Sequence, residues 1–213
     1  MDQLAYNDVL RMLRGAAAEV RVNHDTLSKL DSVGGDGDHG TTMLRCIEAI
    51  ETAIAQAEDR NLAGLLNKAG WAVMGIDGGA TGPLFGSFFL GMSEAAEGRD
   101  ALDAPALADL FQEGLAAIRR RTKAQPGDKT MIDALAPAVD AVKKAAEAGA
   151  PPVDALAAAA KAAETGAIAT RAMQARFGRA KNIGQKSMGA EDPGAASVAC
   201  IFKGFYQGAT TNA

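Results

Sequence analysis

Apolar residues recur every three or four positions along almost the whole chain, and this spacing limits the fold more than any other feature. One apolar face runs from Tyr6 to Val20, and a second runs from Met43 to Ile54. A period near 3.6 residues is typical of α-helices that bury one face. The pattern continues at 62–73, 107–118, 132–142, 153–175 and 198–205, and 83–97 has the composition of a further buried segment. No stretch alternates as a strand, so we predict an all-α fold of about eight helices.

Several of the predicted helices carry start and stop signals. Asp103 with Pro105, and Asp192 followed by Pro193, have the pattern of a capping residue and a first-turn proline. Gly149, which two prolines follow, fits a C-terminal stop. These signals place helix boundaries at defined points of the chain.

The composition is that of a globular protein, with 48% hydrophobic and 23% charged residues among 213. No long linker separates two parts, so residues 1–213 are expected to form a single domain. A net charge of −4 disfavours nonspecific binding to nucleic acid or to an anionic membrane. Met1–Arg11 lacks the pattern of a signal peptide, and the longest apolar run, Ala80–Met92, is too short to span a bilayer. We expect a cytoplasmic protein.

The stretch Asp31–Thr42 has a composition that neither a helix interior nor a strand favours. It reads DSVGGDGDHGTT and holds three carboxylates and four glycines in twelve residues. Asp36 and Asp38 would repel each other across a tight loop, and a shared cation that prefers oxygen ligands, Mg²⁺ or Ca²⁺, would remove that repulsion. The sequence therefore indicates a metal site here.

Four glycine clusters each precede a predicted helix, at 34–40, 75–82, 127–130 and 178–194. Helix N-termini expose unpaired N–H groups with partial positive charge, and glycine lets phosphate oxygens approach the backbone closely. Several such ends that converge would form a polyphosphate site. The alternative is that glycine merely closes tight helix connections.

Three familiar motifs fit the sequence poorly. Gly35–Gly40 satisfies G-x-G-x-x-G, but the dinucleotide fingerprint needs a preceding strand, and two aspartates in the loop would repel a pyrophosphate. A Walker A loop is excluded because no glycine directly precedes Lys129. An EF-hand loop counted from Asp31 would put Thr42 where the bidentate Glu belongs.

Four motifs together resemble, in order and spacing, the nucleotide-binding L subunit of dihydroxyacetone kinases. They are GDGDHG at 35–40, GGATGPLFG at 78–86, PGDKTM at 126–131, and GRA at 178–180 with MGAEDPGAASV at 188–198. The family occurs fused behind a substrate-binding K domain or as a separate subunit, and this chain looks like the separate form. The resemblance implies a barrel of eight antiparallel helices that holds ADP or ATP at one end through two Mg²⁺ ions.

The resemblance also implies the residues of that site. Asp31, Asp36 and Asp38 match the family's metal ligands, although Asp31 alone could be a helix cap. The nucleotide contacts match His39, Gly40, Thr41, Thr42, Ala80, Thr81, Thr122, Met131, Arg179, Asp192, Pro193 and Gly194. Phosphoryl transfer would be carried by the metal–nucleotide centre, so no side chain of this chain is expected to be catalytic.

Individual assignments differ in how directly the chemistry supports them. His39 suits orientation of a phosphate or a carboxylate better than metal binding, because Mg²⁺ prefers oxygen. Thr42 stands where relatives often carry Asn. Met131 on an apolar face is by itself an ordinary core residue. Arg179 suits bidentate phosphate contact, whereas its basic neighbours fit a solvated face.

The activity that the resemblance implies is phosphoryl transfer to a primary hydroxyl of a short ketose, most simply dihydroxyacetone. A K-type partner subunit would hold the ketose. The phosphoryl donor is either ATP or a phosphohistidine protein of the sugar phosphotransferase system, which would recharge bound ADP. The sequence leaves open a homodimer. Two other functions also stay open: a subunit of a kinase for a tetrulose or related sugar, and a nucleotide-bound, non-catalytic protein that binds a transcription regulator.

Overall fold

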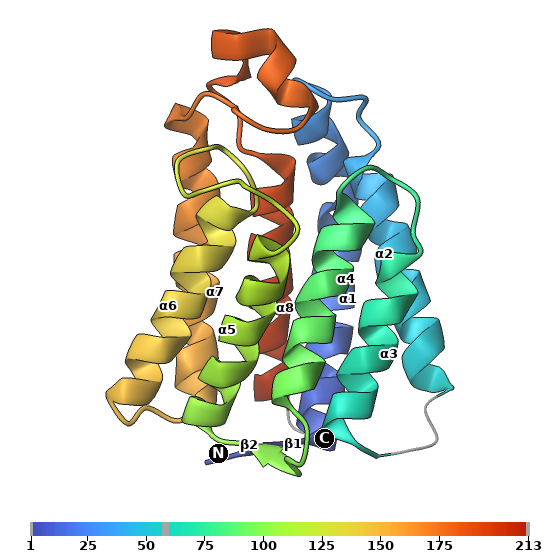
Figure 1. Ribbon diagram of the computed structural model, residues 1–213, viewed down its shortest axis with the longest axis vertical. Coiled ribbons are helices and arrows are strands. Elements are labelled where there is room, and N and C mark those ends of the chain that lie inside the picture. Colours follow the sequence, from blue (N-terminus) through green and yellow to red (C-terminus); the bar gives the residue numbers. More distant parts are fainter. Residues whose placement is uncertain (1, 57–59, 212–213) are drawn as a thin grey trace.

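The computed structural model describes residues 2–56 and 60–211, which form eight α-helices that run alternately up and down (Figure 1). They are α1 Tyr6–Asp31, α2 His39–Ala55, α3 Leu62–Met74, α4 Thr81–Ala95, α5 Ala104–Arg119, α6 Ile132–Glu147, α7 Pro152–Ala169 and α8 Pro193–Thr210. Two 3₁₀ helices, η1 Thr170–Ala172 and η2 Arg179–Ser187, lie between α7 and α8. The predicted all-α fold with about eight helices is confirmed.

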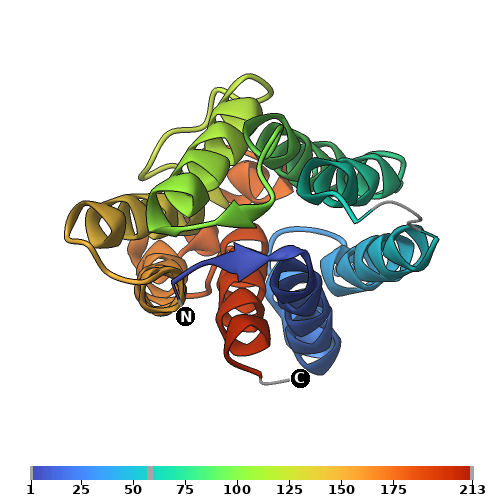
Figure 2. The same cartoon turned by 90° about the horizontal axis from the view of Figure 1, so that it is seen from below.

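The helices form a closed ring. Each helix packs on its neighbour in sequence, and α8 returns to pack along α1 (Figure 2). Four phenylalanines from α4, α5 and α8 fill the inside of this barrel, with ring centroids 5.1 Å apart for Phe111 and Phe202 and 6.1 Å apart for Phe88 and Phe111. Phe205 completes the cluster, and all four are fully buried. Each contributes roughly 1.5–3 kcal/mol of transfer free energy.

Glycines let α1 and α8 approach each other closely. A Cβ atom on Gly15 would lie 2.1 Å from the Gly204 carbonyl oxygen, and one on Gly204 would lie 2.4 Å from the Cα of Ala16. Real Cβ atoms do not approach backbone atoms so closely. The seam that closes the barrel therefore depends on the absence of side chains at these positions.

The structure differs from the sequence-based prediction in two places. Two strands of two residues, β1 Leu4–Ala5 and β2 Ala101–Leu102, pair antiparallel at one end of the barrel. They are too short to show an alternating pattern. The helix predicted over 153–175 is also too long, because α7 ends at Ala169. The Thr170 carbonyl accepts a hydrogen bond from Lys129 Nζ (2.6 Å), a contact across 41 residues that no local pattern reveals.

Both predicted N-terminal caps are confirmed. The Asp103 carboxylate accepts a hydrogen bond from the Ala106 amide at the start of α5 (2.9 Å), and Asp192 accepts one from the Ala195 amide at the start of α8 (2.8 Å). Gly149 follows α6 with φ of +75°, the left-handed conformation that suits a glycine stop.

None of the helices within 2–56 and 60–211 combines the length and the apolar character needed to cross a membrane.

All four glycine clusters lie at one end of the barrel, the upper end in Figure 1. The connections at this end are 32–38, 75–80, 120–131 and 170–192, and α2, α4, α6 and α8 begin there. Helix alternation therefore brings four N-termini together at the same end. This is the arrangement that the glycine clusters predict.

Candidate functional site

A cavity of about 350 Å³ opens at this end of the barrel. All four connections contribute to its lining, from the aspartates of 31–38 to the glycines at 78 and 79, Met131 and Gly194. A volume of this size lies within the range of small-molecule sites. The cavity thus has the size and position expected of a ligand site between helix N-termini.

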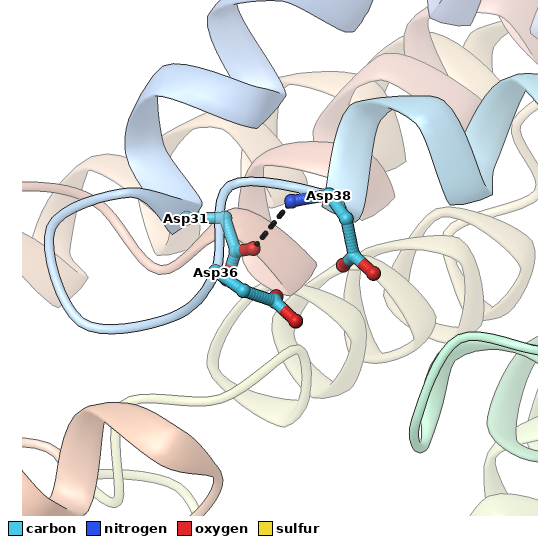
Figure 3. Close-up of side chains that lie close together, drawn as sticks. All are labelled: Asp31, Asp36 and Asp38. Carbon is cyan, nitrogen blue, oxygen red and sulfur yellow. Dashed lines mark hydrogen bonds between the residues drawn. The ribbon is translucent and has the colours of Figure 1, made fainter.

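Three aspartates lie together at the cavity, as Figure 3 shows. Asp31, Asp36 and Asp38 each offer a carboxylate oxygen, and these atoms lie within 4.8 Å of one another. Asp31 is the last residue of α1, where the helix carries partial negative charge. Three carboxylates beside a helix C-terminus repel one another unless a cation is shared. Their oxygen-only donor set fits Mg²⁺ or Ca²⁺.

The loop that carries the aspartates is held by Asp31. Its Oδ2 accepts hydrogen bonds from the Gly37 amide (2.9 Å) and the Asp38 amide (3.1 Å; Figure 3). Gly37 has φ of +77°, and a Cβ there would also lie 2.6 Å from Ser32 Oγ. Asp38 precedes α2, but its side chain caps no backbone N–H. Its carboxylate therefore stays available to a cation.

Arg179 of η2 reaches across the cavity and forms an ion pair with Asp36. The guanidinium thereby supplies positive charge at the aspartate cluster. A second contact joins the same two segments, because a Cβ on Gly34 would lie 2.8 Å from the Cβ of Ala180. The 3₁₀ helix η2 thus packs directly on the connection 32–38, which carries Asp36 and Asp38.

His39 is buried where α2, α4 and α8 begin. Its Nε2 lies 2.8 Å from Ser197 Oγ, and its Nδ1 lies 3.3 Å from Thr81 Oγ1. Burial lowers the pKa of His39, while the charge of Asp31 opposes that change. The imidazole links three helix N-termini.

The predicted nucleotide residues fall into two groups. Most line the cavity: His39, Ala80, Thr81, Thr122, Met131, Arg179, Asp192, Pro193 and Gly194. Gly40, Thr41 and Thr42 do not. Gly40 packs against α1, since a Cβ there would lie 1.9 Å from the His24 carbonyl oxygen. Thr41 is exposed, whereas Thr42 is fully buried beneath Gly78. The nucleotide contacts of both groups stay predictions.

Sequence reasoning missed two residues at the site. Lys129 lines the cavity and is buried, but it received no role although it lies in the PGDKTM motif. Ser197, the partner of His39, also received no role. Its place in the motif at 188–198, one turn after Pro193, was the available signal.

Lys129 and Asp192 both line the cavity, and the charge of each affects the pKa of the other. Burial raises the pKa of Asp192 to about 7, and the hydrogen bond from the Ala195 amide and the charge of Lys129 oppose that rise. Burial lowers the pKa of Lys129, and the charge of Asp192 opposes that change. Each charge therefore helps to keep the other ionised.

Comparison with known families identifies the family of the chain. The model of the DAK2 domain matches residues 33–207. The chain belongs to the DAK2 domain family. The match includes Asp36, Asp38, η2 and the residues that line the cavity, apart from Leu30 and Asp31. The family resemblance that the four motifs predict is thereby confirmed.

Relatives of this DAK2 domain include kinases and kinase subunits. It is 38% identical over 172 residues to the PEP-dependent dihydroxyacetone kinase, ADP-binding subunit DhaL, of Escherichia coli strain K12, which covers 81% of this chain and 82% of that protein. It is 38% identical over 183 residues to the L-erythrulose 1-kinase of Mycolicibacterium smegmatis, over 85% of this chain and 32% of that protein.

A solved structure shares the fold. The dihydroxyacetone kinase from C. freundii in complex with AMP-PNP and Mg²⁺ matches with a TM-score of 0.69 at 29% identity. The match covers 92% of this chain and 33% of that chain. This DAK2 domain therefore corresponds to about a third of the C. freundii kinase, as it does of the erythrulose kinase.

Proposed function

We propose that this chain is the ADP- or ATP-binding subunit of a kinase for dihydroxyacetone or a similar short ketose. One observation carries the proposal: three clustered aspartates lie at a cavity into which four helix N-termini converge. Carboxylates attract Mg²⁺, and helix N-termini attract phosphate. A magnesium nucleotide satisfies both ends of such a site.

The residues of the chain have separate parts in this function. Asp31, Asp36 and Asp38 would hold two Mg²⁺ ions, which when bound neutralise the phosphate oxygens. The backbone N–H groups of Ala80 and Thr81 would donate to phosphate oxygens at the start of α4. Arg179 would exchange its contact with Asp36 for one with phosphate. Phosphoryl transfer then depends on charge and position rather than on a catalytic side chain.

The acceptor sugar would be held by a partner. Asp36 and Asp38 are exposed, so the metal end of the cavity is the end that another protein can reach. We infer a K-type substrate-binding subunit there, and either ATP or a phosphohistidine protein of the phosphotransferase system as donor. The phosphohistidine donor is supported by the E. coli relative, which is described as part of a PEP-dependent kinase. Residues 1–213 would act as one cytoplasmic nucleotide-binding domain, alone or as a homodimer.

A turnover assay with a cognate K subunit tests the proposal. Dihydroxyacetone phosphate should form with ATP or with a phosphorylated donor protein, and only when Mg²⁺ is present. Chelation by EDTA should abolish turnover, and Mg²⁺ should restore it. Absence of turnover with both donors would contradict the catalytic function.

A tetrulose is the second candidate acceptor. The supporting observation is the 38% identity to the L-erythrulose 1-kinase over 85% of this chain. The same assay with erythrulose in place of dihydroxyacetone separates the two substrates. The acceptor with the higher kcat/KM identifies the physiological class.

A further inference from the structure

The segment between α7 and α8 forms a loop over the cavity, which we call the cover loop and define as residues 171–189. It appears in orange-red at the top of Figure 1. Phe177, Arg179 and Ile183 of this loop line the cavity. One edge is fixed by Arg179, which pairs with Asp36, and the other by the Arg176 amide, which donates to the Asp128 carbonyl (3.1 Å). The loop therefore crosses the cavity between two connections.

Lys129 joins the two ends of the cover loop. Its Nζ donates to the Thr170 carbonyl (2.6 Å) and to the Ala190 carbonyl (2.5 Å), the residues directly before and after the loop. The Lys129 residue is only 4% exposed. A buried ammonium loses its hydration, and charge-assisted hydrogen bonds of this kind compensate for that loss. Lys129 thus closes the base of a 19-residue loop together with the Gly189 amide, which donates to the Arg171 carbonyl (2.8 Å).

The backbone at Lys129 is adapted to this contact. Within the described part of the chain, Lys129 is the one non-glycine residue with positive φ, at +59°. This conformation is unfavourable for a residue with a side chain and persists where the surroundings compensate for it. Asp133 fixes the turn, because its carboxylate accepts hydrogen bonds from the amides of Gly127 (2.5 Å) and Thr130 (2.8 Å).

We propose that Lys129 is a positioning residue of the nucleotide site, which clips the two ends of the cover loop together and so keeps Arg179 over the aspartate cluster. The inference rests on the proposed function, since it concerns how the bound nucleotide is retained. Its ammonium acts through the loop rather than through contact with the nucleotide. Loss of the clip lets the loop open and shortens the lifetime of the complex with the nucleotide.

Limited proteolysis and nucleotide dissociation test this proposal on the full chain. The cover loop offers trypsin five basic residues: Arg171, Arg176, Arg179, Lys181 and Lys186. Lys129→Met should raise the rate of cleavage within 171–189, measured without nucleotide, by at least about tenfold. It should also raise the dissociation rate of Mg²⁺–ADP by about tenfold. Mn²⁺ affinity of the aspartate cluster should change less than about twofold, because its ligands are untouched.

Two further variants separate positioning from general destabilisation. Lys129→Arg keeps a charged donor and should recover most of the protection from trypsin. Arg171→Gln removes the ion pair with Glu191 at the same base of the loop (2.6 Å). It should change ADP dissociation, and cleavage at the four remaining basic residues of the loop, less than about twofold. If Lys129→Met does not fold, Lys129→Gln, which can donate to one carbonyl, should give an increase of about threefold.

Unchanged cleavage in Lys129→Met would overturn the clip. Faster ADP dissociation with unchanged cleavage would also overturn it, because Lys129 would then contact the nucleotide directly. If the unaltered protein binds no ADP, the proposed function fails and with it the nucleotide part of the inference. The cleavage comparison would still decide whether Lys129 closes the loop.

Discussion

Helices that begin at the two ends of the barrel treat their first turns differently. At the end opposite the cavity, Asn61 caps α3 by accepting a hydrogen bond from the Gly64 amide (2.8 Å), and Asp103 caps α5. At the cavity end, Asp38 precedes α2 and Ala80 precedes α4, and neither side chain caps its helix. Asp192 does cap α8 at the cavity end, so the difference concerns α2 and α4, whose first turns carry no capping side chain.

This difference has a cost in helix stability at the cavity end. Removing a cap costs a helix about 1 kcal/mol. In return, the first-turn N–H groups of α2 and α4 stay available to an anion. Asp38 is a residue type that caps well, yet its carboxylate joins Asp31 and Asp36 instead. Binding geometry therefore takes precedence over local helix stability at the starts of α2 and α4.

The largest effect on stability should come from a glycine of the wall at which two helices are in close contact. Gly204→Ala places a Cβ 2.4 Å from the backbone of Ala16 and should lower the free energy of unfolding by about 3 kcal/mol. Gly75→Ala is the matched control, because a Cβ there meets nothing within 4 Å. It should change stability by less than about 0.5 kcal/mol. Urea unfolding measures the free energy of unfolding of both variants. Equal losses of stability would contradict the expected difference between the two positions.

The next effect concerns pH and the two capping aspartates. The raised pKa of Asp192, about 7, means that the folded protein binds more protons than the unfolded chain between about pH 4 and 7. Its contribution to stability is therefore present at low pH and is lost as the pH rises towards 7. Asp192→Asn should keep the cap and remove this loss, on the order of 1–2 kcal/mol after screening.

Asp103→Asn at the opposite end is the control for that measurement. The stability difference between each variant and the unaltered protein is followed by urea unfolding from pH 5 to pH 8. The difference should grow with pH for Asp192→Asn and stay flat for Asp103→Asn. A flat profile for both variants would contradict the burial of a charge at the cavity.

The smallest effect tests capping itself. Asp103→Ala should cost about 1 kcal/mol, because the Ala106 amide loses its acceptor. Asp38→Ala should cost less than about 0.5 kcal/mol, since its carboxylate accepts no capping hydrogen bond and its removal relieves repulsion. Thermal unfolding of the two variants measures the contrast. A larger loss for Asp38→Ala would show that the carboxylate serves the helix after all.

The helices and their caps could be predicted because their signals are local. Apolar spacing located the helices except α4, which was expected from its composition, and Asp103 and Asp192 marked two starts correctly. The end of α7 at Ala169 was missed, and the contact that Thr170 makes there could not be predicted because its partner, Lys129, is distant in sequence. The role of Ser197 could not be predicted for the same reason, because its partner His39 lies on another helix.

The candidate site was predictable in part for a related reason. Asp31, Asp36 and Asp38 are neighbours in sequence and carry an unusual composition, so their cluster was visible before the fold. Thr42 is four residues further and belongs to the same motif, but it turns into the core beneath Gly78. Sequence proximity indicates which loop forms a site, whereas helix geometry decides which of its side chains face the ligand.

Calorimetric titration of ADP, with and without Mg²⁺, tests the central claim that the aspartate cluster holds a magnesium nucleotide. Asp36→Asn and Asp38→Asn should each weaken Mg²⁺-dependent ADP binding by at least about a hundredfold, with helical content unchanged, because charge rather than volume is lost. Asp140→Asn, on the exposed side of α6, should bind like the unaltered protein. ADP affinity that survives both substitutions, or that is the same in EDTA, would contradict the account.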